Sequence, residues 1–412
     1  MPAHDPPSSR GFWLGPLAAT VALQATAAFL SRVIPTLAPA FSAGFGWTET
    51  AVGYLAGLGT AGSIAFLIAG TPLIRRVGPV RALQIGLVLS ALGSLLLAWP
   101  SLAVAALASV LIGLGYGPSA PAGSDILQRY APPRHRNLVF SIKQAGVPAG
   151  GVLAGILLPI VLEQGGWGWT LAATIGVALV TTVAVQPLRA RTDAGRDPGQ
   201  SLSPAAIFAL RNLTLPLSVL RTTPDLARLG LVGACLAVGQ GCWFAFLITY
   251  LVLRLEISLP AAGLVFAVMQ AAGIVGRIAL GYLADRLGSG RLVLAATAAA
   301  SAATTLALAA TSPAWPPSAL IMLAAVAGVT VSSWNGLQVA EIARRAPPRL
   351  IGEAASGATL LVFLGYVLGP ALFATLVSAT GRFDLAFLAA SLVTLLALPG
   401  LVRNPRQTPA RD

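Results

Sequence analysis

Long apolar runs follow one another along the whole of this 412-residue chain. Most are about 20 residues long or more, the length that a helix needs to cross the roughly 30 Å hydrocarbon core of a bilayer. Hydrophobic residues make up 56% of the chain and its mean hydropathy is +0.81. A soluble protein of this composition would lack the polar groups needed to cover its surface. The pattern predicts an all-α membrane protein that crosses the bilayer many times.

The runs divide into twelve predicted transmembrane spans. They are residues 13–36, 49–70, 80–99, 102–128, 138–162, 168–188, 227–253, 260–284, 291–311, 317–342, 352–377 and 383–402. The longest polar connection follows the sixth span and divides the chain into halves. We therefore predict an N-terminal six-helix bundle at 1–190, a cytoplasmic linker at 191–226 and a C-terminal six-helix bundle at 227–412. Part of the linker, near 203–213, is expected to form a short interfacial helix.

The formal net charge of +13 is spread over the short segments between the apolar runs. Nucleic-acid-binding proteins gather basic residues on one solvated face, so we expect no nucleic-acid partner. Cytoplasmic loops of membrane proteins are enriched in Lys and Arg. With both termini in the cytoplasm, Arg254 and Arg382 fall outside and Arg32, Lys143 and Arg277 fall within spans, while the other basic residues lie at the inner face. This predicts a multi-pass protein of the cytoplasmic (inner) membrane.

The two halves repeat each other. TPLIRRVGPVR at 71–81 and GYLADRLGSGR at 281–291 share leucine, arginine and glycine positions 210 residues apart, and APPR recurs at 131–134 and 346–349. Because six is an even number of spans, both copies cross the membrane in the same direction. They are therefore expected to be related by an axis along the membrane normal.

The stretch 281–291 resembles the signature loop of the major facilitator superfamily, which joins the second and third helices of a half. The matching residues are Gly281, Leu283, Asp285, Arg286, Gly288 and Arg291. Together with the spans and the duplicated halves, the resemblance covers essentially the whole chain. It implies a secondary transporter whose two bundles rock about a central cavity. It also implies that Asp285 latches the halves together on the cytoplasmic side, the alternative being an ordinary polar loop.

The first-half copy departs from this motif, because Thr71 replaces the first glycine and Arg75 replaces the aspartate. If the packing is pseudo-symmetric, Arg75 approaches the start of the eleventh span, where a cation meets the positive helix end. Glu353 lies in the first turn of that span. We therefore expect either an Arg75–Glu353 pair, an inverted form of the latch, or an arginine that only follows the inside rule.

A second departure concerns energy coupling. Drug–proton antiporters of the superfamily resemble one another in a fourth-span arginine four residues before a glycine. Here Leu111 stands at that distance before Gly115, and the first span has no acidic residue. A drug–proton exchanger of that type is therefore less expected.

Charged side chains inside the spans are costly and point to function. Arg32 lies in a proline-loosened stretch, where it either binds an anionic group bidentately or extends to the outer surface. Lys143 and Gln144 lie in FSIKQAGVPAGG, which resembles a string in bacterial facilitators of the cyanate and organic-anion type. Lys143 either binds substrate or forms an ion pair with Asp125, which lies at similar depth.

Other polar side chains in the spans complete the predicted substrate-binding set. They are Tyr54, Tyr116, Gln240, Trp243, Gln270, Trp334, Asn335 and Gln338. Glu341 shares a helix face with Trp334 and Gln338, and either carries a proton or pairs with Arg344 or Arg345. Arg277 is expected to serve the signature-loop network around Asp285.

Arg32 and Lys143, with no acid deep in the membrane to face them, favour a small organic or inorganic anion as substrate. The alternative is export of amphipathic drugs or metabolites. The spans hold no cluster of His, Cys or acidic residues that would suit an enzyme, and the chain has no phosphate-binding loop for ATP. We expect a monomeric transporter with a small-molecule substrate, possible coupling to protons or another ion, and no metal or cofactor.

Overall fold

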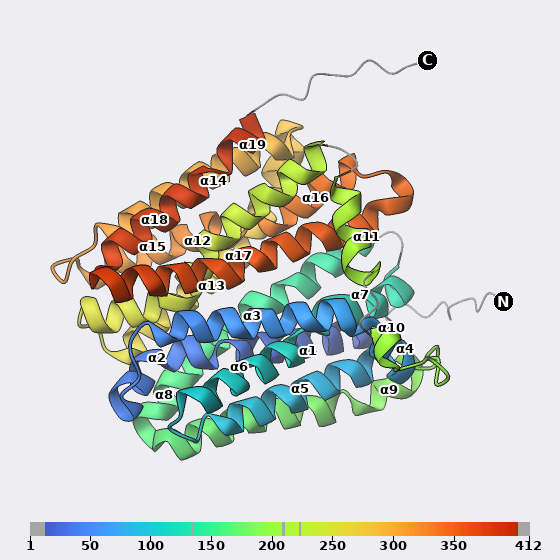
Figure 1. Cartoon of the computed structure of the whole chain (residues 1–412), viewed down its shortest axis with the longest axis horizontal. Coiled ribbons are helices and arrows are strands. Elements are labelled where there is room, and N and C mark those ends of the chain that lie inside the picture. The colour runs from blue at the N-terminus through green and yellow to red at the C-terminus, as the bar shows by residue number, and fades with distance from the viewer. Residues whose placement is uncertain (1–12, 133–134, 208–210, 222–223, 403–412) are drawn as a thin grey trace. The chain divides into compact units, whose positions relative to one another are not determined.

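The computed structural model describes residues 13–132, 135–207, 211–221 and 224–402. Every regular element in this part of the chain is a helix (Figure 1). The helices of the first part are α1 Leu14–Ser31, α2 Val33–Phe45, α3 Ala51–Ala69, α4 Thr71–Val77, α5 Pro79–Leu96, α6 Leu102–Tyr116, α7 Ser119–Tyr130, α8 Arg136–Ala184, α9 Gln186–Thr192, α10 Pro204–Ile207 and α11 Arg211–Leu220. The remaining helices are α12 Pro224–Arg254, α13 Leu259–Leu287, α14 Gly290–Ala309, α15 Pro317–Thr330, α16 Asn335–Arg345, the 3-10 helix η2 Pro348–Leu350, α17 Ile351–Thr380, α18 Phe383–Leu395 and α19 Leu398–Val402. The termini, predicted to be cytoplasmic, and the Pro133–Arg134 part of the repeated APPR motif lie outside the described residues.

Within the described residues, eleven helical stretches are long and apolar enough to cross a membrane. One of them, in α8, covers both the fifth and the sixth predicted span. Gly166 interrupts α8 with φ 73° and ψ −171°, a conformation that lies outside the helical region and that glycine adopts without a side-chain clash. The multi-pass, all-helical prediction is confirmed. The linker helix predicted near 203–213 corresponds to two short helices, α10 and α11.

Three of the predicted spans are interrupted within their length, the first near its end and the other two near their middle. The first breaks at Arg32, between α1 and α2, and the fourth breaks at Gly117–Pro118, between α6 and α7. The tenth unwinds at Val331–Trp334, between α15 and α16. There the Ser333 hydroxyl donates to the Gly328 carbonyl (2.7 Å), a side-chain bond that competes with regular backbone pairing. Each break places backbone polar groups inside a predicted span.

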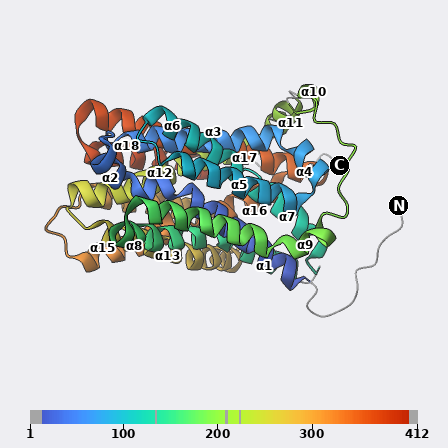
Figure 2. The same cartoon turned by 90° about the horizontal axis from the view of Figure 1, so that it is seen from below.

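The described residues fall into two compact units that interleave along the chain. Unit 1 comprises the described residues within Met1–Val33, Gly62–Ala154 and Val161–Phe208. Unit 2 comprises the described residues within Ile34–Ala61, Gly155–Ile160 and Ala209–Asp412. In unit 1, α5 packs along α6 and both contact α1 (Figure 2). In unit 2, α12 packs along α17, α13 along α15 and α14 along α18. The predicted division at residues 190 and 226 remains a prediction.

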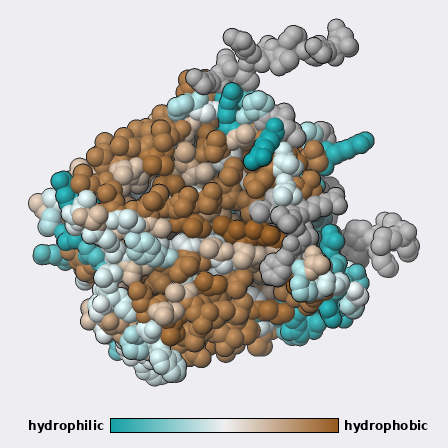
Figure 3. Space-filling view, viewed as in Figure 1, coloured by the Kyte–Doolittle hydropathy of each residue, from teal (hydrophilic) through white to brown (hydrophobic). Residues whose placement is uncertain are grey.

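Large apolar side chains cover the outer faces of the helices. Val180 and Val183 of α8 are 68% and 71% exposed, and Met322 of α15 is 69% exposed. In Figure 3 the visible surface is mostly apolar, and hydrophilic residues gather toward the helix ends. Such surfaces are stable in lipid and not in water, so they agree with a membrane-spanning protein.

Candidate functional site

Lys143 lies in unit 1, seven residues into α8, with only 2% of its surface exposed. Its Nζ donates to the Ala120 carbonyl (3.1 Å) and to the Ser124 hydroxyl (3.0 Å), one turn apart on α7. Gly123 makes room for the side chain, because a Cβ there would lie 2.8 Å from Lys143 Cε. The lysine is therefore held in a fitted pocket between α7 and α8.

The alternative that Lys143 pairs with Asp125 is wrong. Asp125 is ion-paired with Arg129 at 2.6 Å on the same helix, and its side chain is 35% exposed. The positions of these residues around α7 explain this. Ala120 and Ser124 are four residues apart, so they share the helix face that meets Lys143. Asp125 is one residue, or about 100°, further round the helix. In the described part of the chain no carboxylate pairs with Lys143.

Uncharged polar residues of α1 lie near this lysine. The Thr20 methyl of α1 packs against the same Gly123 position as Lys143. Gln24 Nε2, one turn along α1, donates to Gln144 Oε1 (3.2 Å). The Oε1 atom of Gln24 is buried and accepts no hydrogen bond from the described residues. The predicted neighbours Lys143 and Gln144 therefore belong to one polar site in unit 1.

Arg32 and Tyr116 lie at two of the helix breaks. Arg32 ends α1 and is half-buried, eight residues beyond Gln24, which corresponds to about 12 Å along a helix axis. Tyr116 ends α6 and is also half-buried. Arg32 is thus not in the Lys143 pocket.

A second polar cluster surrounds the break at Ser332 in unit 2. The Ser332 carbonyl accepts from Gln240 Nε2 of α12 (3.5 Å) and from Arg277 Nη2 of α13 (3.3 Å). The Tyr366 hydroxyl of α17 donates to Gln240 Oε1 (2.6 Å), and Asn335 Nδ2 lies 3.5 Å from that hydroxyl. Arg277 therefore reaches the unwound part of the tenth predicted span, and its role in the signature-loop network remains a prediction.

Several polar atoms in the segments that form the Ser332 cluster are buried without a hydrogen-bond partner among the described residues. They are both amide atoms of Gln270, the Ser332 hydroxyl, the indole nitrogen of Trp334 and the Asn335 carbonyl oxygen. Gln270 is 1% exposed and lies two turns before Arg277 on α13. Buried polar groups are normally satisfied, so unpaired ones mark places where water or a ligand binds. Tyr366 and Ser332 were not among the predicted site residues.

The predicted tryptophans are buried in helix packing, and the substrate-binding role of the predicted aromatic residues remains a prediction. Trp243 is fully buried, its indole N–H donates to the Thr305 hydroxyl (2.9 Å), and its ring meets Phe387 edge-on. Trp334 is also fully buried, in the apolar core of unit 2. Tyr54, by contrast, is 43% exposed and its hydroxyl pairs with Thr375 of α17 (3.0 Å).

Gln338 and Glu341 of α16 also make local structural contacts. Gln338 Nε2 donates to the Leu229 carbonyl of α12 (2.9 Å). Glu341 is 2% exposed and binds both Arg344 and Arg345, the latter at 2.5 Å between Nη1 and Oε2. The alternative that Glu341 pairs with these arginines is confirmed.

The signature loop closes unit 2 at one end of the helices. Gly288 ends α13 in the left-handed conformation (φ 65°), which a glycine adopts without strain. Arg291 donates to the carbonyls of Leu401 (2.6 Å) and Gly400 (2.9 Å), which ties α14 to α19. Gly281 is half-buried, and Asp285 and Arg286 are exposed. The latch formed by Asp285 remains a prediction.

The first-half copy of the loop is held by a residue that the sequence did not reveal. Asp193, whose side chain is 1% exposed, accepts from the backbone N–H groups of Val80 (2.8 Å) and Arg81 (3.1 Å) at the start of α5. Burial raises the pKa of Asp193, while these two donors and the nearby Arg189 oppose the rise. Arg75 is exposed. Its pairing with Glu353 would join the two units and remains a prediction.

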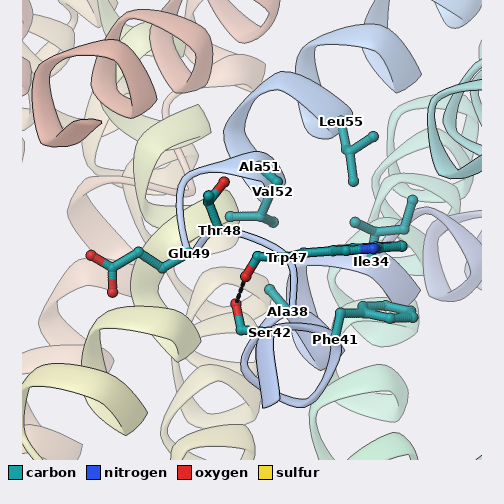
Figure 4. A pocket seen from close by; sticks show the side chains of 10 residues that line it. All are labelled: Ile34, Ala38, Phe41, Ser42, Trp47, Thr48, Glu49, Ala51, Val52 and Leu55. Atoms are coloured by element: carbon teal, nitrogen blue, oxygen red, sulfur yellow. Dashed lines mark hydrogen bonds between the residues drawn. The ribbon is translucent and has the colours of Figure 1, made fainter. Parts of the chain in front are cut away.

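A small pocket lies in unit 2 at the turn between α2 and α3 (Figure 4). About 220 Å³ of empty space, part of it open to solvent, lies beside the stacked rings of Phe41 and Trp47. Its one charged residue, Glu49, forms an ion pair with Arg254 (2.7 Å). None of the predicted substrate-binding residues lines this pocket, so the Lys143 pocket and the Ser332 cluster are the stronger candidate sites.

Comparisons with known proteins agree with this arrangement. An uncharacterised MFS-type transporter of Mycobacterium tuberculosis (strain CDC 1551 / Oshkosh) is 26% identical over 357 residues, which cover 84% of this chain and 75% of that protein. A probable chloroplastic anion transporter of Arabidopsis thaliana is 29% identical over 124 residues, covering 29% of this chain and 23% of that one.

Solved structures share the fold. A bacterial homologue of the human lysosomal transporter Spinster, crystallised in an inward-facing and unoccupied conformation, superimposes with a TM-score of 0.75. It is 18% identical in sequence, and the match covers 96% of this chain and 97% of that one. The family model described as Major Facilitator Superfamily matches residues 17–365 and 255–412. The chain therefore belongs to the major facilitator superfamily.

Proposed function

We propose that this protein is a secondary active transporter that moves a small organic or inorganic anion across the cytoplasmic membrane by alternating access. Family membership indicates membrane transport, and the anion class is the finer step. The observation that carries this step is Lys143, which is buried in a predicted span with no carboxylate partner in the described part of the chain. Ionisable groups inside a membrane are most often functional.

The hydrogen bonds of Lys143 support an anionic ligand. An ammonium group has three N–H donors, and the Ala120 carbonyl and the Ser124 hydroxyl can accept from two of them. A carboxylate or oxyanion at the third position would complete the set and supply the missing counter-charge. The unused Gln24 oxygen beside the site would accept from a hydroxyl or acid proton of the same ligand. The partial similarity to a probable anion transporter of Arabidopsis thaliana agrees with this class.

The alternative, export of amphipathic drugs or metabolites, is less well supported. Such a site needs aromatic rings facing the ligand. The two tryptophans predicted for that role, Trp243 and Trp334, are fully buried in the packing of unit 2.

We further propose that the chain forms twelve transmembrane helices in two pseudo-symmetric six-helix bundles, with both termini cytoplasmic, and that it acts as a monomer. The kink at Gly166 supports this count, because it divides α8 into two stretches that each suffice to span a bilayer. Labelling of single cysteines introduced near residues 10 and 405 in intact cells would test the sidedness, since cytoplasmic positions resist a membrane-impermeant thiol reagent.

The anion class is tested by uptake into proteoliposomes. We expect labelled uptake of at least one member of a panel of succinate, lactate, sulfate and phosphate, without ATP. Lys143→Gln should lower the initial rate more than tenfold for that anion. Arg129→Gln removes a nearby cation that faces away from the pocket and should retain most of the rate. Uptake of no anion, or equal uptake by the Lys143→Gln protein, would show that the anion assignment is wrong.

A further inference from the structure

We propose that Lys143 itself carries the coupling proton, so that it is an uncharged amine in the empty site and takes up one proton with each anion. This inference rests on the proposed function and names the coupling ion, which the family fold leaves open. The proton carrier would then be a base, because Asp125, the acid on the facing helix α7, is paired with Arg129 and not with Lys143.

The hydrogen-bond acceptors that the protein itself offers to Lys143 match a neutral amine. An uncharged lysine has two N–H donors, and the two acceptors within reach are the Ala120 carbonyl and the Ser124 hydroxyl. Alternatively, the Ser124 hydroxyl can donate to the amine lone pair. An ammonium would leave its third N–H without an acceptor among the described residues. Leaving a buried charged donor unpaired is more costly than leaving a neutral group.

The burial of Lys143 also favours its uncharged form. Lys143 is 2% exposed, and Asp125 on the facing helix is paired with Arg129 and not with the lysine. Moving an isolated ammonium out of water costs so much free energy that a buried group loses its charge instead. An anion in the pocket would instead favour the charged ammonium, because opposite charges at short distance stabilise each other strongly where water is excluded. Anion binding and proton uptake are therefore thermodynamically linked.

The neighbouring helices offer no other group that would take this role. The titratable side chains of the facing helix α7 are Asp125, Arg129 and Tyr130. Asp125 and Arg129 neutralise each other, and the Tyr130 hydroxyl donates to the Arg191 carbonyl (3.0 Å). Helix α1, which also contacts the pocket through Thr20, has no titratable residue. No fixed charge from these helices therefore holds Lys143 in its protonated form.

The transport cycle balances without a further reactant. On the entry side the amine takes one proton from water and the ammonium binds the anion, using its third N–H. On the other side the anion leaves and the proton returns to water. A monovalent anion and its proton move together, so the step transfers no net charge. Release of the anion without the proton would leave the unpaired buried ammonium described above.

Direct observation of Lys143 is possible because it is the only lysine in the chain. Protein carrying 13C at lysine Cε, placed in lipid nanodiscs, gives one lysine resonance whose position distinguishes amine from ammonium. At neutral pH we expect the amine position in the empty protein and a shift to the ammonium position on adding the anion that the uptake panel identifies. Lys143→Arg removes the resonance and confirms its origin. An ammonium resonance in the empty protein would overturn the proposal.

A transport measurement separates this inference from the proposed function. With a pH dye inside the liposomes, wild-type protein should acidify the lumen by one proton for each monovalent anion taken up. Asp125→Asn should do the same, whereas Lys143→Arg, which keeps its charge, should exchange anions without acidification. Anion uptake with no acidification, or acidification lost in Asp125→Asn, refutes lysine coupling and leaves anion transport intact. Absence of any anion uptake refutes the proposed function instead.

Discussion

Replacing Asp193 by alanine should release the start of α5. The N-cap position of this helix is Gly78, which has no side chain, so the first backbone donors have no local acceptor. Asp193 supplies one from 113 residues further along the chain by accepting from Val80 and Arg81, the second and third residues of the helix. These are the donors that an N-cap side chain normally satisfies.

The size of the effect follows from these contacts. Loss of an N-cap acceptor costs about 1 kcal/mol, and each buried donor left without a partner costs about 1–3 kcal/mol. We therefore expect Asp193→Ala to destabilise the first turn of α5 by about 2–4 kcal/mol. Since about 1.4 kcal/mol corresponds to a factor of ten, amide exchange there should accelerate by about 30-fold or more.

Hydrogen–deuterium exchange of the peptide that covers residues 79–84 measures this directly. The matched control is Asp197→Ala in the same loop, because Asp197 is exposed and its carboxylate accepts from the Gly199 N–H (3.0 Å) and not from a donor of α5. The control should leave exchange in 79–84 unchanged. Equal exchange in the Asp193→Ala and wild-type proteins would show that the buried carboxylate does not hold this helix.

Three further outcomes follow from the contacts described above. Burial raises the pKa of Asp193, so its protonated form stabilises the fold below the unfolded pKa of about 3.9. This contribution is lost as the pH rises through the folded pKa. The destabilisation caused by Asp193→Asn, measured by thermal unfolding, should therefore be smaller at neutral pH than at acidic pH. Gly150→Ala should lower the melting temperature, because its Cβ would lie 2.1 Å from a backbone oxygen of α1 and overpacking costs about 1–3 kcal/mol, whereas Gly176→Ala, with open space around it, should not. Glu49→Gln and Arg254→Gln should show a coupling of about 0.5–1 kcal/mol in a double-mutant cycle of unfolding, small because the pair is partly exposed, and additive effects would show that the ion pair contributes nothing.

The helical membrane fold could be predicted because hydropathy over about 20 residues reports directly on lipid contact. The helix breaks could not, since a run such as the tenth predicted span stays apolar through Ser332 and Ser333 while its backbone unwinds. Proline and glycine gave the only local indication, as at Gly117–Pro118. At Gly166 the backbone turns within a stretch that remains continuous by hydrogen bonding.

The sequence indicated the charged residue of the candidate site, but it did not indicate which residues contact that side chain. Lys143 was identified because a charged side chain within a membrane span is costly and is usually retained for function. The hydrogen-bond partners of Lys143 depend on whether Ser124 or Asp125 faces it. These adjacent residues point about 100° apart around the helix, and the sequence does not show which of them faces the lysine. Tyr366 and Asp193 were missed because a tyrosine in a span and an aspartate in a polar segment are common; only their contacts with Gln240 and α5 distinguish them.

The use of basic residues in this chain supports a distinct role for Lys143. Every other basic residue besides the histidines is arginine, including Arg277 at the Ser332 break. Arginine remains charged at any accessible pH, so it provides a fixed attraction for an anion but cannot deliver a proton. Lysine is the basic side chain that burial can switch between charged and neutral forms. A lysine in a buried pocket with two acceptors fits the proposed proton-coupled anion site, whereas an arginine there would bind the anion without coupling.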